Sequence, residues 1–264
     1  MYLKRRFWSM LTPKLTAPYV GITGIMNPTE SRSIADAVPT NSKRQAMIGA
    51  LVSQKSLRGR PNQWPNRYPK TDQVADLFLP HSAVFNVVHY NTDDPTTLCQ
   101  QLSEVIQLAG PNLHGFQLNL PWPPPDELGR FADQYPSLKL ILQIGQESCR
   151  LVAEDPAGIA GRLRADYQGL VHYVLLDLSA GYGQALDTSW CLQQLRELRS
   201  ANLELGLGVA GGLSPSSLHL VKPLIKEFPH LSIDAEARLR DERDALDMGL
   251  TLDYIQRAFT MFGD

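Results

Sequence analysis

The chain has 264 residues, of which 43% are hydrophobic and 20% are charged, so it is long enough for one large core or two small ones. This composition, with 19 glycines and 19 prolines, excludes a collagen-like, low-complexity or largely disordered protein. The 25 basic and 27 acidic residues give a formal net charge of -2, which argues against a nucleic-acid binder because such proteins are markedly basic.

The N-terminal segment 1–17 is basic, and its apolar run is too short for the central region of a signal peptide. No stretch of the chain has the roughly 18 to 20 apolar residues that a membrane helix needs. Cys99, Cys149 and Cys191 lie far apart, which favours a reducing compartment over a disulfide framework. We therefore expect a cytoplasmic protein that binds no membrane, with an N-terminal arm over 1–17 and one domain over 18–264.

Short apolar runs recur along the chain at intervals of about 25 to 35 residues, and each has the length of a strand. Near-continuous apolar strands are typical of a parallel sheet that is covered on both faces. The predicted strands are 19–25, 47–52, 84–90, 114–120, 138–144, 171–176, 203–209 and 231–235.

Segments with the apolar spacing of helices lie between these runs, and the spacing predicts helices over 97–108, 189–199 and 250–262. Ser214-Pro215 predicts the start of a further helix, because the first helical turn tolerates proline. This alternation of strands and helices predicts a single-domain (βα)8 TIM barrel of the α/β class. An open doubly wound sheet shows the same alternation, and the number of strands does not exclude it.

A pair of glycines, Gly211 and Gly212, follows the seventh predicted strand and precedes Ser214-Pro215. Glycines at such a place let backbone N–H groups approach an anion, and a helix N-terminus adds partial positive charge. Barrels of this class commonly bind phosphate after the seventh strand. The pair therefore predicts an anion site, and a glycine turn without a ligand is the alternative.

Asp177 follows the apolar run of the sixth predicted strand and precedes a glycine-containing loop. A carboxyl group there would lie at the mouth of the barrel in a partly desolvated place, which raises its pKa and suits it to proton transfer. An aspartate that caps a helix or fixes a loop is the alternative.

Between Asp36 and Asp72 the chain has seven basic residues and no acidic one. The later part, 54–70, is long for a connection between a strand and a helix, and it predicts a basic lid that attracts an anionic ligand. Solvated charge on an exposed loop is the alternative. The six histidines have no metal-ligand spacing, so we expect neither a metal nor a cofactor.

These motifs give the chain, over roughly 19–262, a resemblance to the phosphoribosylanthranilate isomerase family of (βα)8 enzymes. Gly21-Ile-Thr-Gly-Ile25 resembles the family's Lys-Ile-Cys-Gly-Ile, and Phe116-Gln-Leu-Asn119 resembles its Val-Gln-Leu-His. The segment around Arg67 is similar to the family's Pro-Arg-Tyr, and Ala210-Gly-Gly-Leu-Ser-Pro215 is similar to its Ala-Gly-Gly-Leu-x-Pro. Ser232-Ile-Asp-Ala235 resembles the start of the family's Val-Asp-Val-Ser-Ser-Gly.

The resemblance implies an Amadori rearrangement of an N-ribosyl phosphate, in which an acid opens the sugar ring and a base removes the C2 proton. It implies that Asp177 is the acid, that Arg67 meets the carboxylate of anthranilate, and that Gly211 and Gly212 bind phosphate. The ligand that it implies is a small anionic sugar phosphate, with Asn119 in place of the family's fourth-strand histidine.

The chain departs from the family at the base, where Thr23 replaces a cysteine, and a hydroxyl is a far weaker base than a thiol. Glu236 and Arg238 replace the serines and glycine that help to hold phosphate. Glu236 would repel a phosphate, and a bidentate pair with Arg238 would offset its charge. Glu236 is the candidate replacement base. The sequence leaves open three hypotheses: a divergent isomerase or lyase, a barrel that binds a ligand or partner without catalysis, and an isomerase of this family with another base.

Overall fold

The computed structural model describes residues 16–153 and 156–264, so most of the predicted N-terminal arm lies outside the described residues. The described chain forms a closed barrel of parallel strands, each hydrogen-bonded to the next, with β1 paired to β8. The strands are β1 (Tyr19–Thr23), β2 (Gln45–Ser53), β3 (Val84–Asn91), β4 (Gly115–Leu118), β5 (Lys139–Ile144), β6 (Tyr173–Leu176), β7 (Gly206–Ala210) and β8 (Ser232–Ala235). The predicted (βα)8 barrel is confirmed.

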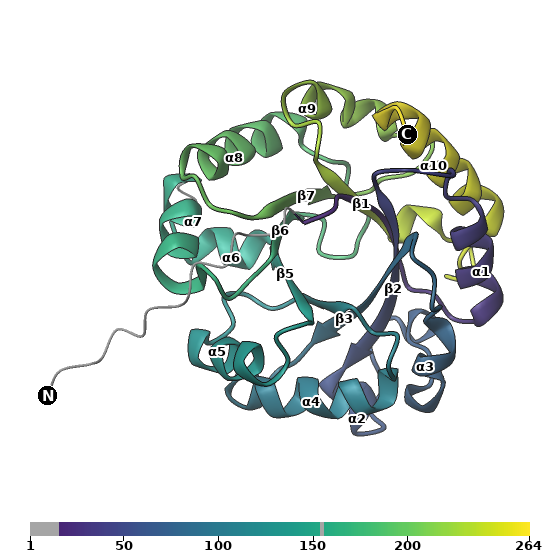
Figure 1. The fold of residues 1–264 in the computed structure, drawn as a ribbon, viewed down its shortest axis with the longest axis horizontal. Coiled ribbons are helices and arrows are strands. Elements are labelled where there is room, and N and C mark those ends of the chain that lie inside the picture. The colour runs from purple at the N-terminus through teal and green to yellow at the C-terminus, as the bar shows by residue number, and fades with distance from the viewer. Residues whose placement is uncertain (1–15, 154–155) are drawn as a thin grey trace, which may run out of the picture.

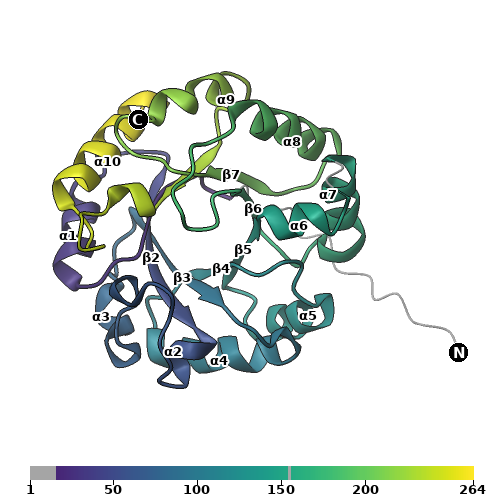
Figure 2. The ribbon, with the colours of Figure 1, turned by 180° about the vertical axis from the view of Figure 1, so that it is seen from behind.

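Helices form a ring outside the strands, as Figures 1 and 2 show from the two ends of the barrel. They are α1 (Pro28–Asp36), α2 (Gln54–Leu57), α3 (Val74–Leu77), α4 (Leu98–Ala109), α5 (Pro125–Gln134), α6 (Gln146–Arg150), α7 (Pro156–Arg162), α8 (Thr188–Ser200), α9 (Lys222–Glu227) and α10 (Met248–Phe262). The helix α10 packs against α1 and so closes the ring. Within the described residues, no helix is both long enough and apolar enough to cross a membrane.

The main core lies between the strands and the helices, because alternate strand residues point outward. On β8, for example, Ile233 and Ala235 belong to this outer core, whereas Asp234 lies on the opposite face. A second apolar cluster fills the barrel near the N-terminal ends of the strands, where the rings of Tyr19, Phe85 and Tyr173 lie 5.6 to 5.8 Å apart. This end of the barrel is therefore plugged by aromatic side chains.

The prediction that a helix begins at Ser214-Pro215 is wrong. Residues 214–217 form a turn in which the backbone N–H of Ser214 donates to Ser217 Oγ at 2.9 Å, and Ser217 Oγ donates to the carbonyl of Gly212. A short 3₁₀ helix over Leu218–Leu220 follows, and α9 begins only at Lys222. Serine side chains here compete with the backbone for hydrogen bonds and favour a turn over a helix.

Candidate functional site

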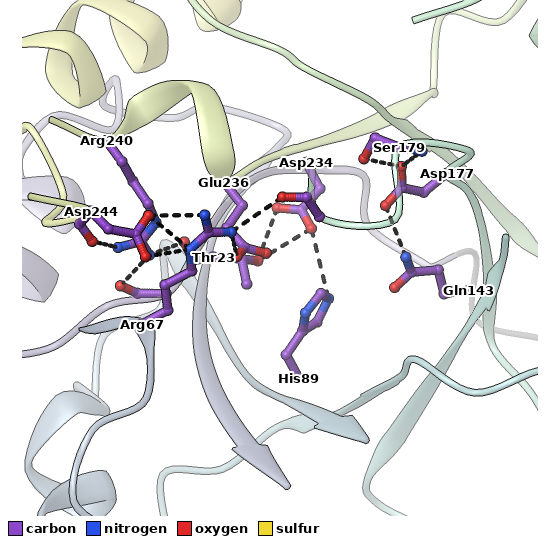
Figure 3. A network of polar contacts seen from close by, with 12 residues as sticks. Thr23, Arg67, His89, Gln143, Asp177, Ser179, Asp234, Glu236, Arg240 and Asp244 are labelled. Atoms are coloured by element: carbon purple, nitrogen blue, oxygen red, sulfur yellow. Dashed lines mark hydrogen bonds and ion pairs between the residues drawn. The ribbon is translucent and has the colours of Figure 1, made fainter. Parts of the chain in front are cut away.

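The C-terminal ends of the strands enclose a polar mouth, which is the end of the barrel where enzymes of this fold carry out chemistry. Figure 3 shows Asp177 with Gln143 and Ser179 on one side, Arg67 with Asp244 and Arg240 on the other, and Asp234 with Thr23 and His89 between them. A cavity of about 90 Å³ is lined by His89, Gln143, Asp177, Asp234 and Glu236 among others. The structure therefore brings Asp177 and Glu236, two of the predicted residues, to one cavity.

Asp177 follows β6 directly, and neutral hydrogen-bond donors approach both of its carboxylate oxygens. The backbone N–H of Ser179 donates to Oδ1 at 2.8 Å and the Ser179 hydroxyl donates to the same oxygen at 2.6 Å. Gln143 Nε2 donates to Oδ2 at 2.8 Å. Burial raises the pKa of Asp177, and the Ser179 hydrogen bonds offset part of that rise.

Gln143 is held in place by a second amide inside the barrel. Gln117 Nε2 donates to Gln143 Oε1 at 3.2 Å, which turns the amide nitrogen of Gln143 toward Asp177. Gln117 is fully buried on β4, so this chain of amides is shielded from water. The arrangement supplies Asp177 with a donor of fixed orientation.

Asp234, on β8, is 4% exposed and lies beside Thr23 at the end of β1. The Thr23 hydroxyl donates to both carboxylate oxygens of Asp234, at 3.1 and 3.2 Å. Burial, followed by the nearby Glu236, raises the pKa of Asp234 well above its ordinary value. Thr23 is itself fully buried, and its contact with Asp234 is that of a hydrogen-bond donor.

His89, on β3, is 8% exposed, and its Nε2 lies 3.9 Å from Asp234 Oδ2. Burial lowers the pKa of His89 to about 3, so the ring is neutral near pH 7 and forms no ion pair with Asp234. Its Nε2 is buried and has no hydrogen-bond partner within the described part of the chain. His89 is one of the residues that line the central cavity.

Arg67 lies in the connection after β2 and pairs with two carboxylates from the far end of the chain. Its Nη1 lies 2.9 Å from Glu236 Oε1, and its Nη2 lies 2.9 Å from Asp244 Oδ1. Its Nε donates to both oxygens of Asp244, and the side chain is 7% exposed. The guanidinium predicted to meet a substrate carboxylate thus already holds two carboxylates of the protein.

Glu236, the predicted replacement base, follows β8 and accepts a hydrogen bond from Arg67 at 2.9 Å. Burial raises its pKa, and the charges of Arg67 and Arg240 act against that rise. Arg240 Nη2 donates to the carbonyl of Gly24 at 2.9 Å, and a Cβ on Gly24 would lie 1.8 Å from that nitrogen. A glycine is required there, because Arg240 passes directly against the loop after β1.

Gly211 and Gly212 both have positive φ angles, of 134° and 52°, and both line the central cavity. A Cβ on Gly212 would lie 2.6 Å from the carbonyl oxygen of Gly183 and 2.7 Å from that of Gln184. The absence of a side chain at Gly212 therefore lets the backbone of the loop after β6 pack directly against it. Its role as an anion site stays a prediction.

The remaining predicted residues lie at the rim. Asn119 is exposed after β4, and it lines both the central cavity and a neighbouring cleft. Arg238 is exposed after β8, and its Nε donates to the carbonyl of Gly183 at 2.9 Å. Neither side chain contributes to the contacts around Asp177 or Asp234 given above.

The basic loop predicted to form a lid does lie over the mouth. Trp64 lines the central cavity, and its ring would be 2.9 Å from a Cβ on Gly181 in the loop after β6. The ring also lies 5.6 Å from that of Tyr182, edge to face, and Arg67 lies over it at 4.7 Å. The two loops therefore meet above the carboxyl groups and close the centre of the mouth.

Among the described residues, three larger cavities share lining residues with this closed centre, and two of them reach the loop after β6. A cleft of about 670 Å³ shares Asn119, Gln143, Asp177 and Ala180 with the central cavity. Another, of about 230 Å³, shares Ser179, Ala210 and Gly211 with it. Asp177 therefore lies where the closed centre meets the large cleft. In the described part of the chain, no group of three His, Cys, Asp or Glu side chains is placed to hold a metal ion.

A scan against models of protein families found no match for this sequence, and a search of curated proteins found none either. Solved structures do match it in fold. Phosphoribosyl anthranilate isomerase from Thermotoga maritima superposes with a TM-score of 0.62 at 18% identity, over 91% of this chain and 98% of that one. A phosphoribosyl anthranilate isomerase in complex with reduced 1-(o-carboxyphenylamino)-1-deoxyribulose 5-phosphate gives a TM-score of 0.60 at 17% identity, over 91% and 98%.

The catalytic domain of a chitinase from Pyrococcus furiosus matches nearly as well, with a TM-score of 0.58 at 11% identity, over 95% of this chain and 98% of that domain. An isomerase and a glycosidase thus share the architecture of this chain. Identities this low show the fold alone, because one barrel supports many chemistries. The function has to be argued from the side chains at the mouth.

Asp234 and His89 were not among the site residues predicted from the sequence. Asp234 lies inside a strand, between two residues of the outer core, and so reads as part of an apolar run. Alternation along β8 is the signal that finds it: Ser232, Asp234 and Glu236 share one face of the strand, and that face lines the barrel interior. Asp244 was also missed, because nothing local connects it to Arg67, 177 residues earlier.

Proposed function

We propose that this barrel is a divergent isomerase that binds a phosphorylated sugar derivative and moves a proton within it. The observation that carries the proposal is the position of Asp177, whose pKa is raised by burial and which lines both the central cavity and the large cleft. Perturbed carboxyl groups in such a place are typical of acid–base sites. The motif order and the fold shared with phosphoribosyl anthranilate isomerases support the same class.

The resemblance gives Asp177, Gly211 and Gly212 their proposed roles, and we propose roles for Arg238 and Asn119 at positions where the chain departs from the family. Asp177 takes part in proton transfer, as the general acid in the family's scheme, and the backbone of Gly211 and Gly212 with Arg238 binds the phosphate. Asn119 contacts the sugar from the rim. One neighbour holds a reduced carboxyphenylamino-deoxyribulose phosphate, and a ligand of that class has the phosphate and hydroxyl groups that this mouth would meet.

Binding in the centre requires the two loops above it to part. The central cavity of about 90 Å³ is smaller than the roughly 300–1,000 Å³ of typical ligand pockets. The cleft of about 670 Å³ lies within that range and already reaches Asp177. We propose that the ligand enters through the cleft and that Trp64 leaves Gly181 as it moves into the centre.

The test measures binding and turnover separately. The reduced carboxyphenylamino-deoxyribulose phosphate is titrated by calorimetry, and the N-ribosyl phosphate of anthranilate is offered as substrate, with complementation of a tryptophan auxotroph as a second readout. Asp177→Asn should bind as the wild type does and lose roughly 10² to 10⁴ in kcat. Asp133→Asn, an exposed change on α5, is the matched control and should change neither value.

Binding by the wild type without turnover would favour a barrel that holds its ligand without catalysis. If the wild type neither binds the analogue nor converts the substrate, the proposed function is wrong.

A further inference from the structure

Four carboxyl groups and two arginines lie at the mouth, and their pairing is unequal. Arg67 contacts Glu236 and Asp244, and Arg240 donates to the carbonyl of Asp244 while its charge acts on Glu236. These two arginines therefore balance Glu236 and Asp244. Asp177 and Asp234 remain, and no arginine or lysine forms an ion pair with either within the described residues.

The charged form of Asp177 has more hydrogen-bond donors than that of Asp234. Its two oxygens accept three hydrogen bonds, from the backbone and hydroxyl of Ser179 and from the amide of Gln143. A backbone N–H cannot reverse its direction, so Oδ1 is fixed as an acceptor. A carboxyl group that accepts three such bonds is stabilised in the charged form.

Asp234 is equipped to hold a proton. Its side-chain neighbours are one threonine hydroxyl, shared between both oxygens, and the neutral ring of His89 at 3.9 Å. The backbone N–H of Ala235 is its other donor, so Asp234 has fewer donors than Asp177. The phenols of Tyr19 and Tyr254, which burial keeps neutral, and the carboxylates of Glu236 and Asp177 supply no positive charge. A buried carboxyl group without a cation takes up a proton more readily than one that accepts three hydrogen bonds.

Strand β1 gives Asp234 no cation either. A Cβ on Gly21 would lie 2.6 Å from Asp234 Oδ1, so the carboxyl group occupies the space where another residue would place its side chain. The family motif that this strand resembles has a lysine at that position. The glycine removes a counter-charge from Asp234 and makes room for its side chain.

We propose that Asp234 is the proton donor of the site and Asp177 the proton acceptor, the reverse of the role that the family resemblance gives Asp177. The inference rests on the proposed function, since both groups act on a sugar held between them. Two carboxyl groups in unlike surroundings divide acid and base work in this way. Thr23 is then a positioning residue that orients Asp234.

With Asp234 as the donor and Asp177 as the acceptor, the protons and electrons of the rearrangement balance. Asp234 gives its proton to the ring oxygen as the C1–O bond breaks, and the nitrogen lone pair forms the C1=N bond. Asp177 takes the C2 proton, the C–H pair forms C1=C2, and the C1=N pair returns to nitrogen. Ketonisation then moves a proton from Asp177 to C1 and the 2-hydroxyl proton to Asp234, which restores the starting state.

The first measurement locates the proton without requiring activity. Infrared difference spectra between the wild type and each variant are recorded at pH 7. The C=O band of a protonated carboxyl group should be lost in Asp234→Asn and retained in Asp177→Asn. Asp244→Asn, which changes a carboxylate paired with Arg67, is the control and should leave the band in place. If Asp234→Asn does not fold, Thr23→Val should shift the frequency of the same band.

The second measurement separates donor from acceptor. Asp177→Ala and Asp234→Ala should each lose roughly 10² to 10⁴ in kcat. Added formate should restore part of the turnover of Asp177→Ala, because a small carboxylate replaces a missing base, and should not restore that of Asp234→Ala.

Two results would overturn the inference: a C=O band of a protonated carboxyl group that belongs to Asp177, or formate rescue of Asp234→Ala alone. A wild type without turnover would overturn the proposed function and the catalytic roles with it, whereas the infrared band would still show which carboxyl group holds the proton.

Discussion

On the side of the mouth formed by the segment after β8 and the loop after β2, charge is buried as ion pairs, whereas on the side of β6 it is buried with neutral donors. Arg67 joins Glu236 and Asp244 on the first side, and Ser179 and Gln143 surround Asp177 on the second (Figure 3). Each ion pair stabilises the charged form of both partners. Neutral donors leave the carboxyl group able to exchange a proton near the pH at which an enzyme works.

In this contrast, the ion-paired side holds segments of the chain together, whereas the side with neutral donors is suited to proton transfer. The ion-paired side connects the loop after β2 to the segment after β8, and so ties together residues that are far apart in the chain. Asp234 lies between the two sides: it has no cation, and its donors are the Thr23 hydroxyl and the backbone N–H of Ala235. The predictions below each change one side of this comparison.

The largest expected effect is on the ion-paired side. Arg67→Met leaves the carboxylates of Glu236 and Asp244 without their partner, and breaking such a buried pair costs about 3–5 kcal/mol. Urea denaturation measures the loss in the free energy of unfolding. Arg58→Met, which breaks an exposed pair with Glu104, is the control and should leave the free energy of unfolding nearly unchanged. Equal losses in the two variants would show that the Arg67 pairs do not hold the mouth together.

The barrel could be predicted from the sequence because its strands are buried on both faces and read as apolar runs. Asp177 and the glycine pair could be selected because they follow strands directly. The pairing of Arg67 with Glu236 could not, since the two residues are 169 positions apart and each reads alone as a surface charge. The helix start at Ser214 was wrong because local serine hydrogen bonds outweigh the signal of the proline.

Asp234 should make the protein less stable as the pH rises. Its pKa in the folded protein lies well above that of an unfolded aspartate, about 3.9, so the folded state binds the extra proton between these two values. The free energy of unfolding then falls by about 1.4 kcal/mol for each pH unit in that window. Asp234→Asn lacks this contribution and should gain stability relative to the wild type as the pH rises from about 4 toward neutrality.

Urea denaturation of both proteins across that pH range measures the difference, with Asp133→Asn as the exposed control. A constant difference between wild type and Asp234→Asn would mean that Asp234 is ionised in the folded protein. In that case the middle of the mouth would resemble its ion-paired side.

The smallest effect is expected on the neutral side, from Gln143→Leu. Removing the amide that donates to Asp177 Oδ2 disfavours the carboxylate and raises the pKa of Asp177 further. A hydrogen bond to a charged group stabilises the charged form, so its loss moves the pKa of Asp177 upward. If Asp177 accepts the proton, it must be ionised, so the low-pH limb of the kcat profile should move to higher pH. If Asp177 donates the proton, the high-pH limb should move to higher pH instead.

Gln146→Leu is the matched control, because Gln146 lines the same cleft and donates to the carbonyl of Leu178 rather than to Asp177. A profile unchanged in Gln143→Leu would show that the proton transfer does not depend on Asp177, and the neutral side of the mouth would then be structural as well.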